Sequence, residues 1–179
     1  MRPPLFYSYK MKLEITTQPT GTDLLPLSTA KEFLRVDHSD EDTTITALIN
    51  AAVQHCQDYT NRHFVSSNFT LSLDDFYNCE FSTGPINTIT GVTYKDAAGA
   101  TQTLATSKYW YDTKREPGRI HFDSPPDTFD DDFNTVTISG TIGAAPADPI
   151  LHAVKMLVAH YYENRRAVIT GTITAEIPL

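Results

Sequence analysis

The chain has 179 residues, of which 40% are apolar and 11% aromatic, a composition typical of globular proteins that excludes disordered ones. A chain of this length buries roughly 70% of its unfolded surface, so one domain, or one domain with an insertion, can hold its own core. Lys and Arg total 14 against 22 Asp and Glu, and the net charge of −8 excludes a protein that binds nucleic-acid phosphates tightly.

The first 26 residues show no convincing periodicity and contain four prolines, which predicts an extended N-terminal arm over residues 1–26. Met11 is an alternative start, because an ordered segment begins there. The opening residues lack the apolar run of a signal peptide. No stretch reaches the ~18 apolar residues that span a bilayer, so we expect no membrane contact.

Two amphipathic helices follow the arm. The first is short, over residues 27–36, with Ser28 or Thr29 as its cap. The second begins at Ser39 with three carboxylates in its first turn and ends near Asn61. Its apolar stripe recurs at steps of three and four residues and comprises Ile45, Leu48, Ile49, Ala52, Val53, Cys56 and Tyr59.

Over residues 65–145 the hydrophobic pattern changes to a period of two, which predicts about six short antiparallel strands in a sandwich or barrel. Turn sequences at Asp96–Gly99 and Glu116–Gly118 separate the strands. A third helix then starts at Asp148 and Pro149 and runs to Arg166. Its stripe comprises Ile150, Ala153, Val154, Leu157, Val158 and Tyr161. Residues 167–179 are predicted to form an extended tail.

The order of these elements predicts an α+β fold. The two helical stripes can bury each other only if the β segment leaves and returns as an insertion. We therefore expect a small helical bundle, residues 27–64 and 146–166, with an inserted antiparallel β domain at 65–145.

Candidate chemistry is sparse in this sequence. His152 and His160 lie eight residues apart, too far to share a metal without other ligands, and the acidic run Asp130–Asp132 lacks the spacing of a calcium loop. Cys56 lies on an apolar stripe, and both it and Cys79 are expected to be free thiols. There is no nucleophile elbow and no phosphate-binding glycine loop. We expect no metal, no cofactor and no enzymatic activity.

The aromatic run Tyr109-Trp110-Tyr111 has two interpretations. Exposed rings could stack nucleic-acid bases, but their place in a period-two strand favours core and cross-strand packing. By contrast, Tyr162 and Arg165 stand near the end of the last helix, a combination that is typical of protein interfaces.

Five motifs, in order, resemble the head–tail connector (adaptor) proteins of tailed bacteriophages. The first is LSTAKEFLRVD (27–37) followed by DED (40–42), and the second is YTNR (59–62) at the end of the long helix. The others are GPI (84–86) with ITGVTY (89–94), EPGRI (116–120), and the last helix through VAHYYENR (158–165). The likeness covers residues 13–166. The two ends depart from the family pattern. The first ten residues are additional, and the tail lacks the further helical segment with which the family's chains end.

The resemblance implies a structural subunit of the virion, made in the host cytoplasm and located at the head–tail interface. It implies a homo-oligomeric ring, with twelve copies expected, that lies under the portal protein. The ring extends the channel through which double-stranded DNA passes without specific binding, and it docks a tail or head-completion protein. Two alternatives stay open: a β-rich protein- or ligand-binding module without catalysis, and a small hydrolase.

Contacts with neighbouring copies or partner proteins are expected from the two arms and the end of the last helix. β-prone arms of this kind commonly add a strand to a neighbouring sheet. The candidate contact residues are Leu5, Phe6, Tyr7, Tyr162, Arg165, Arg166, Ile169, Ile173, Ile177 and Leu179.

Overall fold

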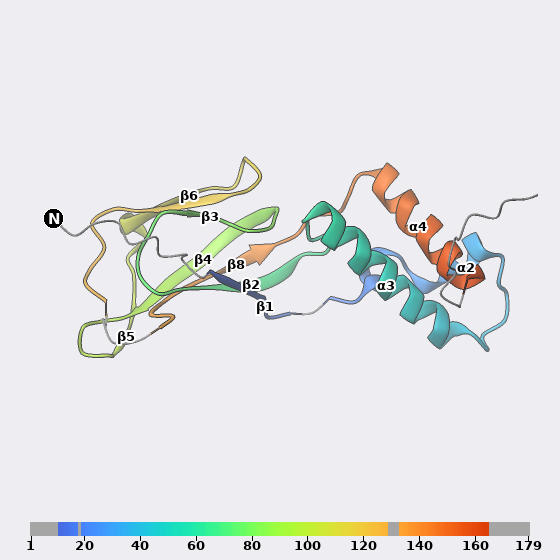
Figure 1. Ribbon diagram of the computed structural model, residues 1–179, viewed down its shortest axis with the longest axis horizontal. Helices are drawn as coiled ribbons and strands as arrows, with labels where there is room; N and C mark the ends of the chain where they lie inside the picture. Colours follow the sequence, from blue (N-terminus) through green and yellow to red (C-terminus); the bar gives the residue numbers. More distant parts are fainter. Residues whose placement is uncertain (1–10, 18, 129–132, 165–179) are drawn as a thin grey trace, which may run out of the picture.

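The computed structural model describes residues 11–17, 19–128 and 133–164. Helices gather at one end of an elongated molecule and two antiparallel sheets gather at the other (Figure 1). The α+β prediction is confirmed. The sheets do not close into a barrel, so the sandwich is the form that the β region takes.

The helical end contains α1 (Gly21–Leu24), α2 (Leu27–Leu34), α3 (Asp42–Thr60) and α4 (Asp148–Glu163). The stripes of α3 and α4 bury each other as predicted, with Ile45, Ile49 and Val53 in the same cluster as Val154 and Val158. Two stripe residues are exceptions, because Tyr59 and Ala153 are exposed.

The helix boundaries match the sequence predictions to within a few residues, but the capping residues differ. Pro26, not Ser28 or Thr29, is the N-cap of α2, since its carbonyl accepts the first helical bond from Ala30. Glu41 and Ala147 hold the corresponding positions of α3 and α4. Arg35 and Asn61 end α2 and α3 in the left-handed conformation, and Asn at this position is common.

The larger sheet has five strands in the order β1-β2-β8-β4-β5. These are β1 (Lys12–Ile15), β2 (Ser67–Leu73), β8 (Val136–Ile142), β4 (Ile86–Lys95) and β5 (Thr101–Thr103). The predicted hairpin at Asp96–Gly99 connects β4 to β5. β1 pairs with β2 along its whole length, although the sequence analysis had placed it in the N-terminal arm together with α1.

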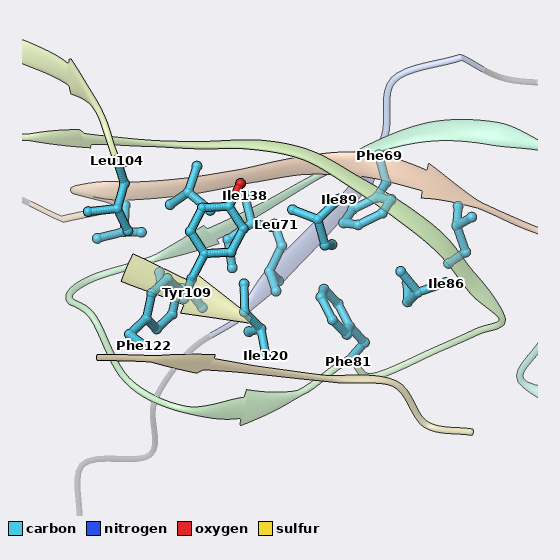
Figure 2. Close-up of a cluster of buried hydrophobic side chains, with 14 residues drawn as sticks. Phe69, Leu71, Phe81, Ile86, Ile89, Leu104, Tyr109, Ile120, Phe122 and Ile138 are labelled. Atoms are coloured by element: carbon cyan, nitrogen blue, oxygen red, sulfur yellow. The ribbon is translucent and has the colours of Figure 1, made fainter. Parts of the chain in front are cut away.

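The smaller sheet has three strands in the order β3-β7-β6. They are β3 (Cys79–Glu80), β7 (Arg119–Phe122) and β6 (Tyr109–Asp112), which follows a short 3-10 turn, η1 (Thr106–Lys108). The predicted turn at Glu116–Gly118 connects β6 to β7. Figure 2 shows Ile120 and Phe122 of this sheet facing Phe69 and Ile138 of the larger one, in a single buried cluster.

Gly140 of β8 lies where the packing leaves no room for a side chain. A Cβ at this position would stand 2.2 Å from the Thr88 carbonyl oxygen and 2.8 Å from the Phe69 ring. Glycine therefore allows β4 and the Phe69 side chain to approach β8 closely.

Two chain segments join the helices to the sheets, one after α3 and one before α4. The His63 N–H donates to the Gly84 carbonyl at 2.8 Å, and the Ala144 N–H donates to the His63 carbonyl at 3.1 Å. The Gly143 N–H donates to the Pro85 carbonyl at 2.8 Å. These backbone bonds tie both connections to the start of β4, so the helices and sheets meet at one hydrogen-bonded junction.

Candidate assembly surfaces

Large apolar side chains are exposed at both ends of the molecule. At the helical end they are Phe33, Tyr59 and Met156, and at the sheet end they are Trp110, Tyr111 and Phe133. Apolar surface of this kind, when it gathers on one face, marks places where another protein can bind.

On α3, an exposed ridge runs along the helix at steps of four residues. It consists of Ala47, Ala51, His55 and Tyr59, all exposed and none formally charged at pH 7. Residues at this spacing lie one above the other on a helix surface. Tyr59 is 87% exposed, the largest exposed fraction among the exposed large apolar side chains of the described residues. We call this surface the α3 ridge.

A second exposed ridge lies on α4 at the same spacing. It consists of His152, Met156 and His160, again without formal charge, and Met156 is 57% exposed. The Phe33 ring of α2 packs edge-on against the His152 ring, with ring centroids 6.1 Å apart. We call this surface the α4 ridge.

The outer face of the small sheet holds a shallow pocket of about 490 Å³. Trp110 of β6 packs beside His121 of β7, with ring centroids 4.9 Å apart, and Arg119 forms a 3.3 Å ion pair with Asp112 beside them. Trp110 is 53% exposed, and Tyr111 is exposed as well.

The predicted core packing of the aromatic run is therefore confirmed only for Tyr109, which is buried, and the predicted cross-strand packing is confirmed for Trp110, which pairs with His121. Trp110 points away from the cluster between the sheets because side chains alternate along a strand. Tyr111 shares a face of the strand with Tyr109 but is exposed, near the end of β6, which is an edge strand of its sheet. The hydrophobic run alone could not indicate that β6 lies at an edge.

Only one of the candidate contact residues falls within the described residues. The Tyr162 hydroxyl donates a hydrogen bond to the Glu41 carboxylate, which links the end of α4 to the start of α3. Its contact with a partner stays a prediction. Leu5, Phe6, Tyr7, Arg165, Arg166, Ile169, Ile173, Ile177 and Leu179 lie outside the described residues.

Both cysteines are free thiols, as predicted. Burial raises the pKa of the Cys79 thiol to about 11 and also raises the pKa of Cys56. Neither thiol therefore has the low pKa of a reactive cysteine.

No group of three or more His, Cys, Asp or Glu side chains within the described ranges is placed to hold a metal ion. Asp130–Asp132 lie outside those ranges. Among the described helices, none is long and apolar enough to cross a membrane.

Comparison with known proteins gives a family match over most of the chain. The model of the family described as "Head completion protein" matches residues 23–176. The chain belongs to this family. The match agrees with the head–tail resemblance seen in the motifs, and it makes the protein a structural component of a phage-type head–tail assembly.

Solved structures with the same fold come from gene transfer agent (GTA) particles. A chain of "Virion of native gene transfer agent (GTA) particle" is 25% identical, with a TM-score of 0.73 over 90% of this chain and 89% of that one. A chain of "Neck of native GTA particle computed with C12 symmetry" is 24% identical, with a TM-score of 0.69 over 90% and 88%. A chain of "Neck of empty GTA particle computed with C6 symmetry" is 23% identical, with a TM-score of 0.69 over 91% and 89%. No curated protein sequence matches the chain.

Proposed function

We propose that this head completion protein is a ring-forming head–tail connector (adaptor). In this proposal, copies of the chain form a ring under the portal protein, and twelve copies is the expected number. The ring extends the DNA channel and offers its far side to a tail or head-completion protein. The observation that carries the proposal is the likeness, over 90% of the chain, to a chain from a particle neck with C12 symmetry.

The shape of the subunit supports this role. Its helices and sheets lie at opposite ends of one long axis (Figure 1), so one molecule can contact different neighbours at its two ends. We assign the helical core to residues 27–64 and 146–166 and the inserted β domain to residues 65–145. The arms, residues 1–26 and 167–179, are assigned to contacts with neighbouring chains, although β1 and α1 show that part of the first arm belongs to the folded subunit.

The charge of the subunit also fits a channel that DNA passes through. With a net charge of −8, a ring repels the phosphate backbone on average and does not slow its passage by tight binding. We therefore expect the wall that faces the DNA to be neutral or acidic.

Electron cryomicroscopy of intact particles tests the proposal. We expect density for a closed ring of this chain between the portal and the tail, with a lumen that is not lined mainly by Lys and Arg. If the chain lies elsewhere in the particle, or is present there only as isolated copies, the connector role is wrong. A ring with a lumen lined by Lys and Arg would refute the passive channel.

A further inference from the structure

The α3 ridge and the α4 ridge are two different exposed surfaces of the same helical core. A ring built from identical copies in head-to-tail order needs two different surfaces on each copy, because the front of one copy meets the back of the next. We propose that the α3 ridge of one copy packs against the α4 ridge of the next. This inference rests on the proposed ring and names the surfaces that close it.

Charge selects these two surfaces for contact with a second copy. Every copy carries the same net charge of −8, so two copies repel each other wherever their carboxylates meet. The middle of each ridge is free of formal charge, and the carboxylates stand at the ridge ends, at Asp58 on α3 and Glu163 on α4. Depletion of charge from the middle of a surface, with Tyr and Met in its place, is the composition of an interface core.

The shapes of the two ridges also complement each other. Ala47 and Ala51 make most of the α3 ridge low, which lets the axis of another helix approach to about 8 Å. Met156 and the two imidazoles make the α4 ridge high. From first to last residue the α4 ridge spans eight residue steps and the α3 ridge twelve, roughly 12 Å and 18 Å of helix, so the shorter ridge fits beside the longer.

Tyr59 and Phe33 complete the contact at its edges. At the end of the α3 ridge, Tyr59 provides a rigid aromatic side chain of the kind that anchors interfaces. Phe33 packs against His152 within each subunit, so α2 already contacts the first residue of the α4 ridge before a neighbour binds.

The test uses the full-length chain, in particles and as purified protein. Ala51→Glu places a carboxylate in the middle of the α3 ridge, at an exposed position where Glu suits a helix nearly as well as Ala. Met156→Lys places an ammonium group in the middle of the α4 ridge. Ser28→Glu is the matched control, because it adds the same charge at an exposed position in the first turn of α2, a helix that carries neither ridge.

We expect Ala51→Glu to lower ring occupancy in particle necks by at least about tenfold, since it buries an unpaired charge at every interface. Ser28→Glu should leave the occupancy unchanged. The double variant Ala51→Glu/Met156→Lys should restore the ring, because each interface then joins one carboxylate to one ammonium group. Circular dichroism and the melting temperature of each purified variant check that the fold is intact.

The outcomes separate this inference from the proposed function. If the ring forms in Ala51→Glu particles at the wild-type occupancy, the ridge contact is refuted and the connector role stands. Loss of the ring in Ala51→Glu without restoration in the double variant refutes the pairing of the two ridges. Absence of any ring in wild-type particles overturns the proposed function and this inference with it.

Discussion

The guanidinium of Arg62 lies 2.9 Å from the Glu116 carboxylate, so the end of α3 is linked to the β6–β7 turn 54 residues further along the chain. The two side chains are 40% and 42% exposed, and solvent therefore screens their attraction. The backbone bonds beside them, at His63 and Gly143, are the stronger elements of the junction.

We expect Glu116→Gln to lower the free energy of unfolding by no more than about 1 kcal/mol. Gly143→Ala should lower it more, because Gly143 has a φ of +107° and a Cβ there would stand 2.2 Å from the Val65 carbonyl oxygen. Urea titrations of the two variants compare the effects. A larger loss in Glu116→Gln than in Gly143→Ala would mean that the ion pair, and not the backbone, holds the junction.

The close packing around Gly140 leads to a prediction about stability. Gly140→Ala should cost about 1–3 kcal/mol of stability, because the added methyl group meets the Thr88 carbonyl and the Phe69 ring. Gly91→Ala in β4 is the control, since nothing lies within 4 Å of a Cβ at that position. It should be neutral, or stabilising by up to about 1 kcal/mol. Equal losses in the two variants, measured by thermal denaturation, would contradict the close approach of β4 and Phe69.

His63 should make the stability depend on pH. Burial lowers the pKa of its imidazole below the ordinary value of 6.5, although Asp58 acts in the opposite direction. In the unfolded chain the imidazole takes up a proton as the pH falls through 6.5, while in the folded protein it stays neutral to lower pH. Its contribution is therefore complete above pH 6.5 and is lost on acidification.

We expect the free energy of unfolding to fall as the pH is lowered below 6.5, and to fall less in His63→Gln. Denaturant titrations of both proteins at each pH measure the difference. Parallel curves would show that His63 does not contribute.

The Cys79 thiol should react slowly in the folded protein. With its pKa at about 11, its thiolate fraction at pH 8 is about a hundredfold below that of an ordinary thiol. Iodoacetamide labelling followed by peptide mass spectrometry should show Cys79 protected in buffer and modified quickly in guanidinium chloride. Rapid labelling of Cys79 in buffer would contradict its partial burial.

Deleting residues 167–179 tests the assignment of the tail to partner contacts. We expect a folded, soluble subunit whose melting temperature is nearly unchanged, together with particles that fail to complete. Ordering a dozen residues costs on the order of 10–20 kcal/mol of backbone entropy, which only an extensive interface can offset. If the truncated chain unfolds, the tail belongs to the core, and if it completes particles, the tail is dispensable.

The sequence predicted the elements whose periodicity is long and strong. The apolar steps from Ile45 to Cys56 indicate α3, and the alternation from Phe69 to Leu73 indicates β2. The same periodicity placed Tyr59 on the buried stripe. At 100° per residue, however, Tyr59 stands about 40° from Ile45, on the side of Ala51 and His55.

Short elements held by distant partners could not be predicted in this way. β1 has four residues, and it is a strand because Ile15 pairs with Phe69, a partner 54 positions away. The α3 and α4 ridges could not be predicted from the sequence for a related reason. No motif or periodicity singles out Ala47 or Met156, and only the packing of α3 on α4 determines which sides of the two helices remain exposed.

The pairing of Ser67 with Ile142 has a mechanical consequence. β2 begins and β8 ends at the same end of the large sheet. From that end, one connection runs from β2 back to α3 and the other runs from β8 on to α4. Tension between the helices and the sheets therefore pulls β2 and β8 in the same direction, without sliding one past the other. The load passes as shear into the outer ladders, β1 with β2 and β8 with β4, where many hydrogen bonds must break together before either strand moves.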